Sequence, residues 1–209
     1  MSKITWNGHS CFSVQQDGYV IVFDPYEDGS VPGLGPLRIE GDAVICSHEH
    51  HDHNGRTCVA LRQREAANPW QITTLYSYHD NKLGRLRGVN NITILDDGSQ
   101  RIAHMGDIGC MPDDDQLTAL SGLDVMMVPI GGYYTMEPAD IHTLIQKTAP
   151  RIVVPMHYRS DEKGFGYDVI AEAEVFLKDA DNVIFLDSNA FDPETIKGSA
   201  TVMLTLQNR

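Results

Sequence analysis

Short apolar runs rich in valine, isoleucine and tyrosine recur from the beginning of the chain to its end. Runs of this length, bounded by turn residues, are typical of β-strands. The pattern predicts strands over residues 3–6, 11–15, 19–23, 43–46, 72–76, 91–95, 101–104, 125–129, 152–154, 182–185 and 201–206. Tight turns such as Gln16-Asp17-Gly18 join the first of them, which indicates antiparallel pairing.

Helical periodicity falls between the strands. It predicts helices over residues 57–67, 113–120, 138–148 and 167–179. The third has proline in its first turn, where the ring is tolerated, and it ends before Pro150. Antiparallel strands followed by alternating strands and helices favour an α/β sandwich, in which two mixed sheets pack face to face with helices outside. We expect one domain over residues 1–209, with residues 26–37 as a surface loop bordering the functional site.

The charge and composition narrow the class of protein. A formal net charge of −13 argues against a nucleic-acid partner, which needs clustered cations. The chain has no apolar run long enough for a membrane-spanning helix, and its first residues do not resemble a signal peptide. Its four cysteines are far apart, as expected for reduced thiols in a cytoplasmic protein. The sequence leaves the oligomeric state open.

The segment after the strand at 43–46 carries the strongest chemical signal. It reads Ser47-His48-Glu49-His50-His51-Asp52-His53, with four histidines and two acids within six residues. Imidazole nitrogens suit Zn²⁺, Fe²⁺ or Mn²⁺, and a carboxylate adds an oxygen ligand. His48 and His50 alternate and can face one way, whereas Asp52 and His53 follow them and can reach a second metal.

This segment resembles the signature of the metallo-β-lactamase superfamily. Further stretches are similar to small metal-dependent hydrolases related to the L-ascorbate-6-phosphate lactonases. They are residues 8–12 (GHSCF), 24–26 (DPY), 103–109 (AHMGDIG), 128–132 (VPIGG) and 154–158 (VPMHY). They occur in the family's order between residue 4 and about residue 160. The resemblance implies the metallo-β-lactamase αβ/βα sandwich.

The resemblance also implies a ligand set for two divalent metal ions, with Zn²⁺ preferred over Mn²⁺ or Fe²⁺. One metal is expected on His48, His50 and His79, the other on Asp52, His53 and His157, with Asp107 bridging. His104 is an alternative to His79, because the match at His79 rests only on Tyr78-His79-Asp80. We favour His79, since His104 lies three residues before Asp107 and should point elsewhere.

Neighbouring residues are expected to support these ligands or the substrate. Asp24 resembles the aspartate that backs a metal-bound histidine, and such carboxylates orient the ring. His9 is expected to border the site. Loop residues after two of the matched stretches could bind substrate through hydroxyl donors: Tyr133, Tyr134, Thr135 and Tyr158.

Together these features predict a metal-dependent hydrolase acting on a small ester, lactone or phosphodiester. Two metals can share a water and lower its pKa from 15.7 towards roughly 7, and Asp52 is expected to orient the resulting hydroxide. An anionic small-molecule substrate fits despite the acidic chain, because bound cations reverse the charge locally. The alternatives are a diiron redox enzyme and a non-catalytic metal-binding or interaction protein on the same fold.

Overall fold

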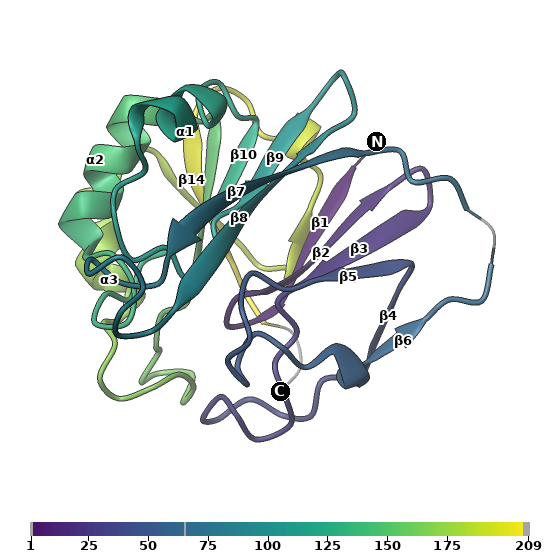
Figure 1. The fold of residues 1–209 in the computed structure, drawn as a ribbon, viewed down its shortest axis with the longest axis horizontal. Helices are drawn as coiled ribbons and strands as arrows, with labels where there is room; N and C mark the ends of the chain where they lie inside the picture. Colours follow the sequence, from purple (N-terminus) through teal and green to yellow (C-terminus); the bar gives the residue numbers. More distant parts are fainter. Residues whose placement is uncertain (1, 65, 207–209) are drawn as a thin grey trace.

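The computed structural model describes residues 2–64 and 66–206. Two sheets face each other across a shared core, and a short parallel pair lies beside them (Figure 1). The five-stranded sheet has the order β13 (Ala190–Phe191), β1 (Lys3–Gly8), β2 (Cys11–Gln16), β3 (Tyr19–Phe23) and β5 (Ala43–Ile45). The seven-stranded sheet has the order β12 (Val183–Leu186), β14 (Ala200–Leu204), β11 (Ile152–Met156), β10 (Val125–Pro129), β9 (Arg101–His104), β8 (Val89–Asp96) and β7 (Gln71–Tyr78).

Pairing within the sheets follows the connections. In the first sheet β1, β2 and β3 form an antiparallel meander, and β5 joins β3 in parallel. In the second, β7, β8 and β9 are antiparallel, whereas β9, β10, β11, β14 and β12 are parallel neighbours. Parallel strands place their carboxyl ends at one edge, which is where ligands are commonly bound.

The core lies between the sheets. Phe12 and Phe23 from the first sheet and Ile92 and Val125 from the second belong to one cluster of buried side chains. β1 alternates between buried and more exposed positions, as expected for a strand with one face on the core. β10 and β11 are buried throughout, because they lie at the centre of the larger sheet.

Two of the four predicted helices form much as expected. α2 (Pro138–Thr148) has the predicted bounds and begins with proline. α1 (Asp114–Ala119) is preceded by Asp113, whose carboxylate accepts a hydrogen bond from the Gln116 N–H in a capping box.

The helix predicted over residues 57–67 is wrong. The chain forms a 3₁₀ turn, η1 (Arg56–Cys58), and then β6 (Val59–Leu61), which pairs in parallel with β4 (Ile39–Gly41). Beyond β6, Arg62 and Arg64 reach Asp42 at 3.3 and 2.7 Å. Strand pairing and these ion pairs outweigh the local helical preference. Residue 65 lies outside the described part of the chain.

The helix predicted over residues 167–179 is much shorter. Only α3 (Ala173–Leu177) is helical. The preceding residues make other contacts: the Tyr167 hydroxyl donates to the Ser30 carbonyl oxygen at 2.8 Å, and the Ala171 carbonyl accepts from the Arg159 N–H. These contacts hold residues 167–172 in an irregular loop. A 3₁₀ turn, η2 (Pro193–Thr195), precedes the last strand.

The sandwich is covered unequally on its two outer faces. In Figure 1 the three α-helices lie against the seven-stranded sheet. The five-stranded sheet is covered instead by residues 26–37 with β4 and β6, where Tyr26, Val31 and Val59 pack on Val20 and Val22. The expected fold class is confirmed, with no α-helix among residues 2–64 covering the smaller sheet. No helix formed by the described residues is long and apolar enough to cross a membrane.

Candidate metal centre

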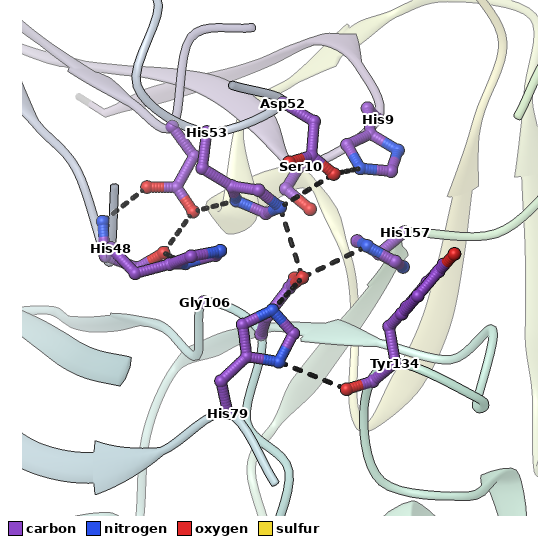
Figure 2. A network of polar contacts seen from close by, with 12 residues as sticks. His9, Ser10, His48, Asp52, His53, His79, Gly106, Tyr134 and His157 are labelled. Atoms are coloured by element: carbon purple, nitrogen blue, oxygen red, sulfur yellow. Dashed lines mark hydrogen bonds and ion pairs between the residues drawn. The ribbon is translucent and has the colours of Figure 1, made fainter. Parts of the chain in front are cut away.

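The predicted ligands come together at one end of the sandwich (Figure 2). The histidine-rich loop follows β5 from the smaller sheet. His79, Asp107 and His157 follow β7, β9 and β11 of the larger sheet. Each ligand therefore lies just beyond a strand end, where the strand fixes the position of the backbone and the loop turns the side chain inward.

The first group of possible ligands consists of His48, His50 and His79. One nitrogen from each lies within 4.8 Å of the others. His48 and His79 are buried, whereas His50 is exposed. These are the three residues predicted for the first metal.

The second group contains Asp52, His53 and His157, and it also contains His9. One ligand atom of each again lies within 4.8 Å of the others, and the His9 Nε2 is 3.3 Å from Asp52 Oδ2. The sequence predicts His9 only as a neighbour of the site. The structure places its ring among the possible ligands.

Asp107 lies between the two groups. Its Oδ2 atom is 3.2 Å from the Nε2 of His79, 3.2 Å from that of His53 and 3.1 Å from that of His157. In Figure 2 these three rings point at this common oxygen. One carboxylate oxygen thus contacts members of both groups, which is the position that a bridging ligand requires.

The donor atoms of the site fit a cation. His48 Nε2 and Asp107 Oδ1 are buried and have no hydrogen-bond partner among the described residues, and the Nε2 atoms of His53 and His157 lie near Asp107 Oδ2 without hydrogen-bond geometry. Leaving a polar atom buried without a partner costs roughly 1–3 kcal/mol. Several such atoms aimed at one region are explained by a bound metal, for which imidazole and carboxylate are suitable donors.

Asp24 organises the histidine-rich loop from behind. Its Oδ1 accepts from the Ser47 N–H at 2.6 Å, and its Oδ2 accepts from the Ser47 hydroxyl at 2.6 Å. The same Oδ2 lies 2.7 Å from His53 Nδ1. This contact leaves His53 Nε2 directed at Asp107, as expected for a carboxylate that sets the tautomer and orientation of a ligand.

Three residues of the site have left-handed backbone conformations. The φ angles are 52° at His9, 41° at Asp24 and 50° at His157. Such conformations cost about 1–3 kcal/mol for residues other than glycine and concentrate at functional sites. Beside His157, a Cβ on Gly131 would lie 2.3 Å from the His157 carbonyl oxygen, so the close approach requires glycine.

The electrostatics of the site favour neutral His9 and His48, ionised carboxylates and a protonated His53. Burial, aided by neighbouring histidines, lowers the pKa of His48 to about 3 and that of His9 to about 4. Burial acts to raise the pKa of Asp107, but His157 and His53 outweigh it and hold that pKa well below its usual value. Burial likewise opposes protonation of His53, yet Asp107, Asp24 and Asp52 together raise its pKa well above 6.5.

The rings of His79 and His104 point in different directions, and that of His79 faces Asp107. The His104 Nε2–H donates to the Ser10 carbonyl oxygen at 2.9 Å, and the ring stacks on Phe23. It belongs to neither ligand group. The His79 Nδ1 instead meets the Tyr134 carbonyl oxygen at 3.1 Å, which leaves its Nε2 facing Asp107.

The predicted substrate residues separate into two sets. Tyr133, Tyr134 and Thr135 line a cavity of about 290 Å³ beside His79, together with Arg87 and Cys110. Tyr158 instead is buried, packs on Trp6 and Phe165 and lines a different cavity, so its contact with substrate stays a prediction.

Tyr167 is a site residue that sequence reasoning missed. Its ring centre lies 5.8 Å from that of His9 and 5.9 Å from that of Tyr134. In the sequence it begins a predicted helix, and no matched motif contains it. Tertiary contacts hold it beside the candidate metal centre: its hydroxyl donates to the Ser30 carbonyl oxygen, and the Gly166 N–H donates to that of Pro32.

Known proteins share the fold and much of the sequence. Residues 3–157 match the family model described as the beta-lactamase superfamily domain. A UPF0173 protein of Pyrococcus furiosus is 32% identical over 181 residues, covering 75% of this chain and 83% of that protein. A UPF0173 metal-dependent hydrolase of Carboxydothermus hydrogenoformans is 28% identical over 193 residues, covering 76% and 85%.

A solved structure of another protein is similar to this chain in both fold and sequence. The protein, from Thermotoga maritima, is described as a Zn-dependent hydrolase of the metallo-β-lactamase superfamily. It is 26% identical, aligns over 99% of this chain and 100% of its own, and has a TM-score of 0.76. The likeness to L-ascorbate-6-phosphate lactonases is not confirmed by these comparisons. On the model match and the Pyrococcus relative, the chain belongs to the UPF0173 metal-dependent hydrolase family of the metallo-β-lactamase superfamily.

Proposed function

We propose that this protein binds two divalent metal ions, with Zn²⁺ preferred, and hydrolyses a small ester, lactone or phosphodiester. The observation that carries the proposal is the pair of donor groups joined through Asp107 Oδ2. His48, His50 and His79 would hold one ion, and Asp52, His53 and His157 the other. The description of the Thermotoga relative as Zn-dependent supports the choice of metal.

Bound metals would supply a hydroxide nucleophile at neutral pH and an electrophile for the substrate oxygen. Three of the four cysteines, Cys11, Cys46 and Cys110, are poorly suited to act as an alternative nucleophile. Burial raises the pKa of Cys46 to about 12 and raises that of Cys11 and Cys110 as well, so these thiols stay protonated.

Asp52 is the carboxylate placed to orient the attacking group. Its side chain is 16% exposed, whereas that of Asp107 is 2% exposed. Asp52 Oδ2 lies 3.3 Å from His9 Nε2, and neighbouring histidines hold its pKa below the usual value although burial acts to raise it. An ionised carboxylate at the accessible side of the site can accept a hydrogen bond from the attacking group and orient it.

The surroundings favour a small substrate. The rings of Tyr134 and Tyr167 lie beside the site, and the cavity beyond Tyr134 holds about 290 Å³. That volume is at the lower limit of small-molecule sites, which span roughly 300–1,000 Å³. The resemblance to lactonases and the general chemistry of dinuclear sites favour lactones and phosphodiesters as the classes to assay.

The proposal is tested with metal-loaded protein and a panel of lactones, esters and bis-p-nitrophenyl phosphate. We expect turnover of at least one of these substrate classes. The Asp52→Asn substitution should lower the rate of that turnover about 10²-fold or more, the scale on which catalytic groups act. Asp17→Asn is a matched control, because Asp17 lies in the exposed turn between β2 and β3. An Asp52→Asn protein that is folded, metal-loaded and as active as the parent would refute the mechanism.

A further inference from the structure

Large apolar side chains are exposed together where β7 ends and β8 begins. The exposed fractions are 78% for Tyr76, 36% for Tyr78, 69% for Leu83, 67% for Leu86 and 58% for Val89, and these five residues form what we call the β7 patch. Tyr78 and Val89 are partners in the strand register, and a Cβ on Gly84 would lie 3.0 Å from the Tyr78 ring. Clustered exposure of this kind marks a surface for interaction.

Cations border the β7 patch on the loop between β7 and β8. Lys82 and Arg85 are exposed, and neither forms an ion pair within residues 2–64 and 66–206. The loop is rigid, because the Asp80 carboxylate accepts hydrogen bonds from the backbone N–H groups of residues 82, 84, 86 and 87 at 2.7–3.0 Å. The backbone that carries the two charged side chains is therefore fixed before any partner arrives.

Acids border the β7 patch at the start of α1. Asp114 and Asp115 are exposed, and across the described chain they too have no cationic partner. The Gln116 side-chain amide donates to the Tyr76 carbonyl oxygen at 2.6 Å, which holds this end of α1 beside β7. In Figure 1, α1 lies above the end of β7 and the loop joining β7 to β8 lies below it.

We propose that the β7 patch is the interface with a second copy of this chain. A two-fold axis through the patch would bring Lys82 and Arg85 of each copy against Asp114 and Asp115 of the other, with the tyrosines and leucines buried between them. An interface of this symmetry must be self-complementary, and the unpaired cations and acids at the two sides of the patch satisfy that condition. An anionic membrane or an acidic protein would engage the cations and leave both acids unpaired.

The net charge of the chain also explains why attraction between two copies must come from opposite charges in direct contact. Two copies each carrying a formal net charge of −13 repel one another at long range. At physiological salt the repulsion is screened beyond about 8 Å, whereas opposite charges in contact across the interface are screened much less. The four charged side chains thus select the orientation, and apolar burial supplies the affinity.

The test is sedimentation equilibrium on the wild-type chain and on two charge-reversed variants. The wild type should be a dimer at micromolar concentration. Lys82→Glu with Arg85→Glu should raise the dimer dissociation constant about a hundredfold or more, and so should Asp114→Lys with Asp115→Lys. An equimolar mixture of the two variants should recover the dimer, because each heterodimer restores both contacts. Circular dichroism checks that α1 forms in the second variant.

A charge reversal elsewhere is the control. Lys3 is exposed on β1, so Lys3→Glu should leave the dimer unchanged. Tyr76→Ser should weaken the dimer without altering its salt dependence. A monomeric wild type would overturn the proposal, and so would a dimer that survives both charge reversals. Failure of the mixture to recover the dimer would also overturn it, because each heterodimer places opposite charges together at both contacts.

Discussion

The two sheets contribute to the metal centre in different ways. The five-stranded sheet supplies His48, His50, Asp52 and His53 from one loop after β5. The seven-stranded sheet supplies its ligands singly, each after a different strand and far from the others along the chain: His79, Asp107 and His157. One side of the site is thus a local sequence motif, and the other is assembled only by the pairing of strands.

This difference predicts where the site is most sensitive to backbone changes. The turn carrying Asp107 is held by Asn90, whose Oδ1 accepts from the Asp107 N–H at 2.8 Å and whose amide donates to the Met105 carbonyl oxygen at 2.9 Å. Gly106 lies between Asn90 and Ser47, so it joins the two sides of the site. A fault at this junction should affect both sides together.

The largest effect is expected for Gly106→Ala. Gly106 has a φ of 56°, and a Cβ there would lie 2.3 Å from Asn90 Oδ1 and 2.5 Å from the Ser47 Cβ. Backbone strain and overpacking together should cost about 3 kcal/mol or more of unfolding free energy. Urea unfolding measures the loss.

Gly122→Ala separates strain from crowding. Gly122 also has a positive φ, 67°, but a Cβ there would meet nothing within 4 Å. The Gly122→Ala control should lower the unfolding free energy by about 1–2 kcal/mol. Equal losses in the two variants would show that the junction is not tightly packed and would contradict the account.

A smaller effect is expected for Asp24→Asn, which acts on the motif side alone. Asparagine keeps the size of the side chain but loses the charge facing His53 and one acceptor. Metal affinity should fall about 10–100-fold, the usual effect of removing a carboxylate behind a ligand. Competition with a chromophoric chelator gives the affinity. If Asp24→Asn binds metal as tightly as the Asp17→Asn control, the role of Asp24 is only structural.

The same contrast explains what the sequence could and could not predict. The loop ligands are contiguous, so His48, His50, Asp52 and His53 could be predicted from their types and spacing. The spacing to Asp107 favoured His79 over His104 in the sequence, but the contacts of the two rings, with Tyr134 and Ser10, are tertiary and appear only in the structure. His9 and Tyr167 reach the site through backbone turns and loop contacts that no periodicity reports.

Errors in the fold have the same physical origin. Residues 57–67 contain good helix formers, yet pairing with β4 and the contacts of Arg62 and Arg64 with Asp42 fix an extended chain. These partners are distant in the sequence: Asp42 lies 20 residues from Arg62 and 22 residues from Arg64. Local preference is weak beside such contacts. The helix at 138–148 was predictable because its signals, the proline in its first turn and its apolar face, lie within the segment itself.

The smallest effect concerns pH and distinguishes the metal-free from the metal-bound site. Without metal, Asp107, Asp24 and Asp52 raise the pKa of His53 well above 6.5 against the opposing effect of burial, which favours a proton on His53. A metal ligand must be neutral, and binding therefore expels that proton. Affinity should rise with pH by up to about tenfold per unit, equivalent to about 1.4 kcal/mol, until the pH passes the raised pKa.

In the metal-free protein, folding stability changes with pH in the opposite direction to metal affinity. A raised folded-state pKa stabilises the fold below about pH 6.5, and this contribution is lost as pH rises through the folded pKa. Calorimetric titration at pH 7 in buffers of different ionisation enthalpy counts the released protons. Binding with no proton release would contradict the assignment of His53.

The number of metal ions per chain tests the central claim most directly. Protein loaded with excess Zn²⁺ and then desalted should contain two equivalents by elemental analysis. A His48→Ala, His50→Ala double variant should retain one, and a His53→Ala, His157→Ala double variant should also retain one, because each leaves intact the group proposed for the other metal. A wild-type chain that retains no metal, or variants that all retain the same amount as the wild type, would contradict a dinuclear centre built on these residues.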